Sequence, residues 1–305
     1  MTTLNVYGMG PQGFLVNRKL KPYEQDNLLD VKRPASGTVW DDRALYRFNS
    51  TFVESVDKWY PVRGFIAMGS FLFMALALFG LTGLILLMIM KPQVLGLPVF
   101  LLFLGVLYFA GKMFCSDAFT LTHYPIRVNR KNRQVYAFRR DGTVLKAGWD
   151  DLVWTLYTPS FRRMDVFVIA HVMDRETELI KESFGLKAVA VGRVGEEACR
   201  EHFEFFRRYM EGGPEMVLNA LRPEPLVLLP RLDLQRETWT FGWKLWSRLI
   251  GENWIVMTLW QVVALPTSFL RWIVMKTSKI PQWPQWVEEE CQVAPDDVWA
   301  RDKAR

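Results

Sequence analysis

Two long apolar runs dominate the hydrophobic pattern of the chain. Twenty-seven consecutive uncharged residues extend from Gly64 to Met90, and after Lys91 another twenty extend from Pro92 to Gly111. About 20 apolar residues of helix are enough to cross the hydrocarbon core of a bilayer. A core helix of a soluble protein, which is the alternative, usually carries a polar face within such a length. The pattern therefore predicts a transmembrane helical hairpin over 64–111.

After the hairpin, short apolar stretches alternate with turn residues, which is typical of antiparallel strands. An amphipathic helix is predicted next at Glu196–Glu211, and Gly212-Gly213-Pro214 ends it. Several strands followed by one helix match the order of a pleckstrin-homology-like barrel, a likeness that says little about function. We therefore expect an α+β membrane protein with a β-rich cytoplasmic domain. The predicted strands are 126–128, 134–138, 143–145, 152–157, 164–173, 176–180 and 186–191.

The rest of the chain, 215–305, is rich in Trp and Pro. Trp239, Trp243 and Trp246 share one helical face, which favours helices lying at the membrane interface. A third span over 253–270 is the alternative, although a glutamine and a proline interrupt that stretch. Aromatic side chains of this kind anchor proteins at the headgroup level. The predicted interfacial anchors are Trp59, Tyr60, Trp239, Trp243, Trp246 and Trp254.

Basic residues flank both predicted spans, whereas the connecting loop carries only Lys91. Because basic residues are retained on the cytoplasmic side, both termini are predicted to be cytoplasmic. In a bacterium, the chain would be a multi-pass protein of the inner membrane. The first residues lack the pattern of a secretory signal peptide, so none is expected. The predicted segments are a cytoplasmic N-terminal segment (1–63), the hairpin (64–111), a cytoplasmic antiparallel-β domain ending in a helix (112–214) and an interfacial helical tail (215–305).

A cluster of basic residues soon after the second span is the main candidate for a contact surface. Guanidinium groups bind phosphate oxygens bidentately, so the cluster could hold a lipid headgroup or a partner. The alternative is a solvated hairpin loop. The net charge of +6 does not indicate nucleic acid, because the basic residues lie mainly beside the membrane. The candidate contact residues are Arg127, Arg130, Lys131, Arg133, Arg139 and Arg140.

No arrangement of residues indicates an enzyme, a metal site or a cofactor. The three histidines lack Cys or carboxylate partners at metal-ligand spacing. The stretch Gly8–Gly13 matches the dinucleotide-binding fingerprint, but no βαβ unit follows it. The apolar runs contain no ionisable side chain, which argues against a transporter. The three cysteines are far apart in the chain and fit a reducing compartment.

Three stretches together resemble one family of proteins. They are Asn49–Glu54 with Arg63-Gly64 at the membrane, Arg127–Tyr136, and Phe205–Pro214. The family consists of uncharacterised proteobacterial inner-membrane proteins with a two-helix hairpin, a β-rich cytoplasmic domain and a Trp/Pro-rich tail. Its members tend to be encoded near type VI secretion and antibacterial toxin genes. The resemblance implies this context and provides no catalytic residues.

The sequence therefore predicts a non-enzymatic inner-membrane interaction protein. The resemblance implies an immunity or accessory factor in type VI secretion or interbacterial competition, with the bilayer and a toxin or secretion component as partners. An anionic-lipid-binding module is one alternative, because of the basic cluster. A membrane-inserting effector is another. The oligomeric state stays open, since small residues in the hairpin permit close packing but form no strict GxxxG pair.

Overall fold

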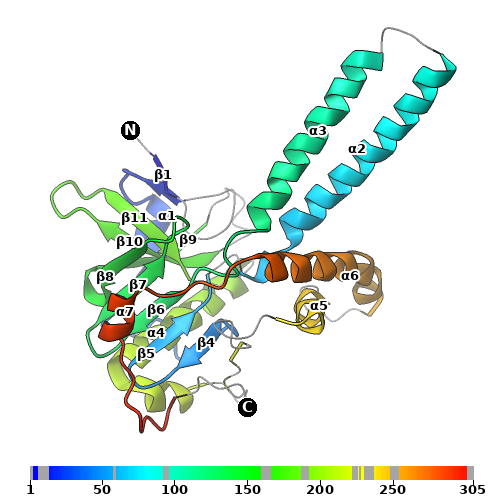
Figure 1. Cartoon of the computed structure of the whole chain (residues 1–305). Coiled ribbons are helices and arrows are strands. Elements are labelled where there is room, and N and C mark those ends of the chain that lie inside the picture. The colour runs from blue at the N-terminus through cyan, green and yellow to red at the C-terminus, as the bar shows by residue number, and fades with distance from the viewer. Residues whose placement is uncertain are drawn as a thin grey trace. The chain divides into compact units, whose positions relative to one another are not determined.

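The chain folds into two units, each assembled from segments that are far apart in the sequence. The first unit contains residues 1–60, 123–235 and 281–305, and the second contains 61–122 and 236–280. This division differs from the four consecutive segments expected above, because the hairpin interrupts a β-sheet (Figure 1). The computed structural model describes residues 3–5, 14–57, 60–91, 96–158, 166–186, 192–221, 226, 228–229, 237–247 and 254–300.

A five-stranded antiparallel sheet lies in the first unit, with its strands in chain order. Strand β5 pairs directly with β6, so that Val53 lies opposite Val128, although the whole hairpin separates the two strands in sequence. The hairpin is therefore an insertion between two neighbouring strands of one sheet. The five strands are β4 (Leu45–Phe48), β5 (Phe52–Ser55), β6 (Ile126–Asn129), β7 (Gln134–Phe138) and β8 (Val144–Gly148).

A second sheet has the order β11-β10-β9-β3, and it includes the strand β3 from the N-terminal part of the chain. The expectation of a strand at 176–180 is wrong, because this stretch is mostly a turn in which Glu178 has a φ of 56°. Two further strands, β1 (Thr3–Asn5) and β2 (Phe14–Val16), pair separately, and a short helix α1 (Pro22–Asp26) follows them. The second sheet contains β3 (Leu28–Leu29), β9 (Val153–Tyr157), β10 (Phe167–Met173) and β11 (Ile180–Gly185).

Helix α4 (Gly192–Leu218) supplies much of the aromatic core of the first unit. Phe203 stacks on Trp149 with ring centroids 6.0 Å apart, and Trp154 lies 5.6 Å from the same ring. The helix is longer than the predicted 196–211, but its regular geometry breaks at Gly213, where φ is 75°. Glycine permits this left-handed conformation because it has no Cβ. The predicted end of the helix is thus a sharp kink.

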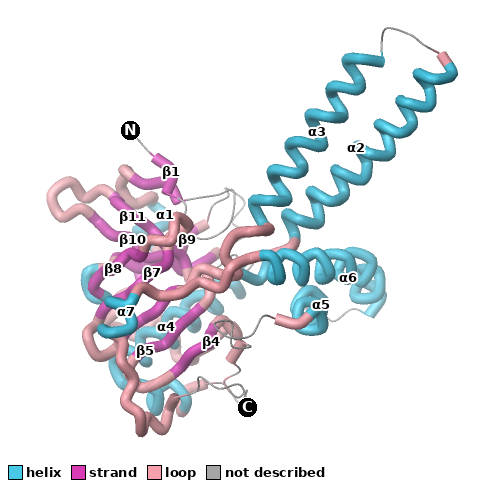
Figure 2. Tube along the Cα trace, viewed as in Figure 1, coloured by secondary structure: helices cyan, strands magenta, loops and turns pink. Residues whose placement is uncertain are grey.

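The described part of the second unit is helical (Figure 2). Its long helices α2 (Phe65–Met90) and α3 (Gly96–Asp117) pack against each other and are both long and apolar enough to cross a membrane. The predicted hairpin helices are confirmed. Large apolar side chains such as Phe79, which is 82% exposed, project from them. Helices α5 (Trp239–Ser247) and α6 (Trp254–Thr277) complete this unit, whereas the short α7 (Gln285–Glu290) belongs to the first.

Candidate membrane and partner contact sites

The turn between β6 and β7 carries Arg130, Lys131 and Arg133 of the predicted basic cluster, whereas Arg139 and Arg140 lie in the next turn, between β7 and β8. Much of the charge in both turns is already paired. Arg133 donates two hydrogen bonds to Asp150, at 2.6 and 2.7 Å, and one to Glu211 at 3.1 Å. These bonds raise the pKa of Arg133. Arg139 forms an ion pair of 2.9 Å with Glu182. Each paired guanidinium has less to offer a phosphate group, because carboxylates occupy its donors.

The other cations of the cluster differ in accessibility. Lys131 and Arg140 are exposed, and they are the members of the cluster that present charge most openly to solvent. Arg130 is partly buried beside the kink of α4, because a Cβ on Gly213 would lie 3.2 Å from its guanidinium carbon. Asn129 shapes the turn, since its side-chain oxygen accepts the backbone N–H of Lys131 at 2.9 Å. A contact at the β6–β7 turn would therefore be carried mainly by Lys131, because Arg140 lies at the other end of β7.

Arg127 is fully buried, which corrects its assignment to the exposed basic cluster. It lies on strand β6 and points to a covered face of the sheet. Its guanidinium is 3.5 Å from the buried Glu54 and donates to Glu288 at 2.9 and 3.2 Å. It also lies over the rings of Phe52 and Trp283, 4.3 and 4.8 Å from their centroids. Burial disfavours the charge, but the two carboxylates outweigh burial and raise the pKa of Arg127.

A segment near the C-terminus, residues 281–291, covers this face of the sheet and is called the C-terminal cover below. Its Trp283 indole N–H donates to Glu54. Val287 and Cys291 are buried in one apolar cluster with Phe52 of the sheet. The cover thus combines an apolar contact with hydrogen bonds to buried charges. Further polar contacts of the cover involve Asn129, Tyr136 and Lys146.

A pocket of about 190 Å³ lies between the cover and the sheet. Arg47 on its wall is 3.6 Å from Glu54 and 3.9 Å from Glu288, so the charged groups around the pocket balance one another. His123 packs edge-on against Tyr46 with centroids 5.0 Å apart. Such a paired network stabilises a fold and does not by itself indicate a reaction. The pocket is lined by Tyr46, Arg47, Glu54, His123, Pro281, Gln282, Trp283 and Glu288.

In the second unit, buried charges hold the two ends of the hairpin together. The Asp117 carboxylate, at the end of α3, accepts the backbone N–H groups of Gly64 and Ala67, at 2.9 and 3.2 Å. It therefore caps the start of α2, where free N–H groups favour a negative charge. Arg63 donates to the Asp117 carbonyl at 2.7 Å and to the Ser278 hydroxyl at 3.2 Å. Both ends of the hairpin are thus fixed to each other and to the segment after α6.

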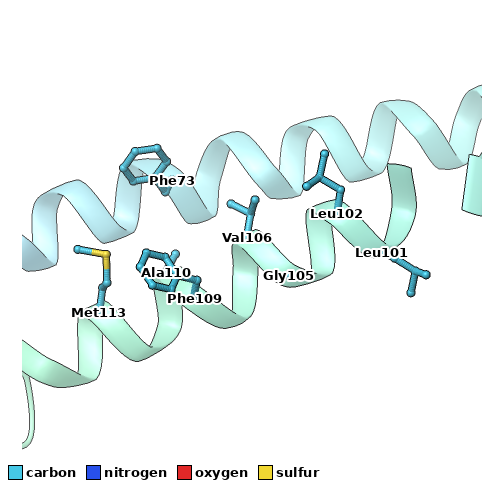
Figure 3. Close-up of a pocket in the computed structure, with 8 residues that line it drawn as sticks. All are labelled: Phe73, Leu101, Leu102, Gly105, Val106, Phe109, Ala110 and Met113. Carbon is cyan, nitrogen blue, oxygen red and sulfur yellow. The ribbon is translucent and has the colours of Figure 1, made fainter. Parts of the chain in front are cut away.

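An apolar groove of about 510 Å³ lies along the hairpin. Phe73 lines it from α2, and the other lining residues come from α3 (Figure 3). Gly105 leaves one side open, because a Cβ there would meet no atom within 4 Å. The groove offers shape but no polar group for recognition. Its lining residues are Phe73, Leu101, Leu102, Gly105, Val106, Phe109, Ala110 and Met113.

The predicted aromatic anchors lie in different environments. Trp239 and Trp243 are 42% and 39% exposed, and their indole N–H groups donate inward to Ser268 and Gln261 of α6. Trp246 is buried, and so is Tyr60. Trp59 and the Trp254 side chain lie outside the described residues, as does the Gly8–Gly13 motif.

The described residues contain no group of three or more His, Cys, Asp or Glu side chains that could hold a metal ion. His171 is buried against the Ser183 hydroxyl, 2.7 Å away, and burial lowers its pKa to about 4. The Cys199 thiol is also buried, which raises its pKa to about 12 and makes it a poor nucleophile. These groups fit structural roles.

Comparison with known proteins gives one match. Residues 100–295 match DUF6708, which is described as a family of unknown function. The match begins inside α3 and includes strands β6 to β11, α4, α5, α6 and the C-terminal cover, whereas strands β1 to β5 and helix α2 precede it. No curated protein and no solved structure matches the chain.

Proposed function

The chain belongs to the DUF6708 family, whose function is unknown, and we propose that it is a non-enzymatic membrane protein that engages a protein partner at the bacterial inner membrane. The observation that carries this proposal is the hairpin. Helices of 26 and 22 residues present exposed Leu, Phe and Ile side chains along their length. In water, such a surface would be a strong aggregation liability, whereas a bilayer stabilises it.

The orientation in this proposal places both termini in the cytoplasm, as a multi-pass topology with a short external loop. Support comes from the basic residues that flank the hairpin, in contrast to the loop, where Lys91 stands alone. Reporter fusions after position 305 and within the loop test it. A cytoplasmic reporter should be active at the C-terminus, and a periplasmic reporter should be active in the loop. The reverse pattern would contradict the orientation.

The first unit is the part of the chain available to a partner in the cytoplasm. Its order of elements, β6 to β11 followed by α4, supports the pleckstrin-homology-like barrel as part of this proposal. Its buried ion network, which joins Arg127, Glu54 and Glu288, suits a stably folded module for protein recognition. We place the partner among toxins or components of type VI secretion, and the resemblance of the three stretches described above supports this choice.

The partner is tested by competition between siblings. A strain that lacks the gene should survive poorly beside its wild-type parent, and the wild-type gene should restore survival. A Phe79→Asp variant should restore it poorly, because a carboxylate at the centre of a span costs about 3 kcal/mol, while Phe79→Leu should behave as wild type. A toxin or secretion component should co-purify from the membrane. Normal survival of the deletion strain, with no such protein bound, would exclude this role.

A further inference from the structure

We propose that the α5–α6 pair lies flat on the membrane surface, where one exposed face of α6 contacts an anionic leaflet. This inference rests on the proposed function, since the hairpin must first place the second unit at a bilayer. The face consists of Leu259, Val262, Leu265 and Phe269 and is called the α6 stripe below. These residues are 68%, 75%, 40% and 50% exposed. Their spacing of three and four residues places them on one side of the helix.

The buried side of α6 is partly polar beside the α6 stripe, although Leu270, Val274 and Met275 nearer the end of the helix are buried as well. Ala264, Thr267, Ser268 and Arg271 are all fully buried. A soluble amphipathic helix buries its large apolar residues and exposes its polar ones. Around the α6 stripe, α6 instead exposes large apolar residues and buries small or polar ones. Such an arrangement is typical of helices in contact with lipid.

Contacts within the second unit fix α6 at the ends of the hairpin (Figure 1). Arg271 forms a bidentate ion pair with Glu237, at 2.5 and 2.9 Å. Its remaining nitrogen donates to the carbonyls of Pro61 and Arg63, immediately before α2. The backbone approaches closely here, because a Cβ on Gly64 would lie 2.6 Å from the Arg271 Cβ. The part of α6 around Arg271 therefore lies at the level at which α2 begins.

The apolar surface is continuous between the hairpin and the α5–α6 pair. Phe65, in the first turn of α2, is 56% exposed and stacks on Trp246 of α5 with centroids 6.0 Å apart. Ala67 of α2 and Ala118 after α3 pack in one cluster with Leu270 of α6. The hairpin and the α5–α6 pair therefore share apolar contacts, and lipid around the start of α2 would also reach the α5–α6 pair.

The charges of this unit complement an anionic leaflet. Of its acidic residues within the described ranges, Asp117 and Glu237 are both buried in the contacts given above. The exposed charged side chains in those ranges are all lysines. Such lysines attract anionic headgroups. They are Lys91 in the loop and, nearer α6, Lys112, Lys244, Lys276 and Lys279.

Depth-dependent fluorescence quenching tests the proposal on the full-length protein. The exposed Cys115 is replaced by Ser, and one cysteine is introduced and labelled with an environment-sensitive dye. The test position is Val262→Cys. The matched control is Val298→Cys, because Val298 is 86% exposed and lies in the other unit. Phe79→Cys reports on the hairpin. The protein is reconstituted in phosphatidylcholine–phosphatidylglycerol vesicles that carry a nitroxide at either a shallow or a deep acyl position.

The dye at 262 should shift to shorter wavelength and lose fluorescence most strongly with the shallow nitroxide, while the dye at 298 changes little. The dye at 79 should be quenched most by the deep nitroxide. If the dye at 79 is not quenched by either nitroxide, membrane insertion of the hairpin is itself contradicted. If the dye at 79 is quenched and the dye at 262 is not, only the placement of α6 on the membrane surface is overturned. Deep quenching at 262 would mean that α6 crosses the bilayer. A blue shift at 262 without lipid quenching would mean that protein covers the stripe. Either result overturns the proposal.

Discussion

Replacing Arg127 by Met tests whether the buried ion network holds the first unit together. The substitution preserves most of the side-chain volume but leaves the Glu54 carboxylate, 1% exposed, without its fully buried partner. Breaking a buried ion pair by removing one member costs about 3–5 kcal/mol. We expect about 3 kcal/mol, near the lower limit, because Arg47 remains 3.6 Å from Glu54 and still offsets part of its charge.

Thermal unfolding in detergent micelles measures this effect. For a unit of nearly 200 residues, 1 kcal/mol shifts Tm by about 2–4 °C, so Arg127→Met should lower Tm on the order of 10 °C. The matched control is Arg133→Met, which breaks a partly exposed pair with Asp150 and should cost about 0–1 kcal/mol. The double variant Arg127→Met, Glu54→Met should be more stable than Arg127→Met alone, because no buried charge is then left unpaired.

The reasoning is refuted if Arg127→Met and Arg133→Met lower Tm equally. It is also refuted if the double variant is less stable than Arg127→Met, since Glu54 would then stabilise the fold without Arg127. Trp283 offers a second readout, because its indole donates to Glu54 and its ring covers Arg127. Loosening of the C-terminal cover should therefore change tryptophan fluorescence before the global transition.

Three further substitutions follow from single contacts. Burial lowers the pKa of His171 to about 4, whereas the unfolded chain takes up this proton near pH 6.5. The free energy of unfolding should therefore be highest above pH 6.5 and fall by about 3 kcal/mol down to pH 4. His171→Gln should remove most of this pH dependence, as measured by Tm at each pH. Gly213→Ala places a Cβ on a residue with φ 75° and 3.2 Å from the Arg130 guanidinium, so it should lower Tm. Gly142→Ala should lower Tm less, because Gly142 has a φ of 87° but open space around its Cβ position. Equal shifts in Tm would argue against a steric clash with Arg130. Gly64→Ala should cost at least about 2 kcal/mol of stability, because its Cβ would collide with the Arg271 backbone 2.7 Å away. Gly69→Ala should be neutral, because a Cβ there meets no atom within 4 Å. Similar yields of folded protein for the two variants would contradict the close packing of α6 against Gly64.

The local elements of the fold could be predicted from the sequence, and the pairing of distant segments could not. The hairpin was predictable because a long uncharged run has few alternatives. The β6–β7 hairpin was predictable from the turn at 129–133 between two alternating stretches. The pairing of β5 with β6 was not, since nothing local indicates that a strand before the membrane segment joins one after it.

Arg127 shows why the candidate site was partly misassigned. In Ile126–Asn129, the arginine alternates with apolar neighbours, which usually places it on the solvent face of a strand. That face is buried only because residues 281–291 return to cover it, more than 150 positions later. The same limit applies to α6. The sequence predicted Trp254 as the contact residue of this helix, whereas among the side chains of α6 that the structure describes, Leu259 and Val262 are the most exposed apolar ones.

The position of the hairpin between β5 and β6 has a consequence for biosynthesis. The ribosome produces β4 and β5 before the apolar helices, and β6, which β5 needs as a neighbour, emerges only after both helices have been made. The five-stranded sheet therefore cannot be completed until the apolar segment has left the ribosome, and the C-terminal cover closes over it last of all. Until β6 has joined β5 and the cover has closed, the first unit exposes an unpaired strand edge and an uncovered face, both of which attract chaperones and proteases. The interrupted sheet thus links completion of the first unit to synthesis of both apolar helices.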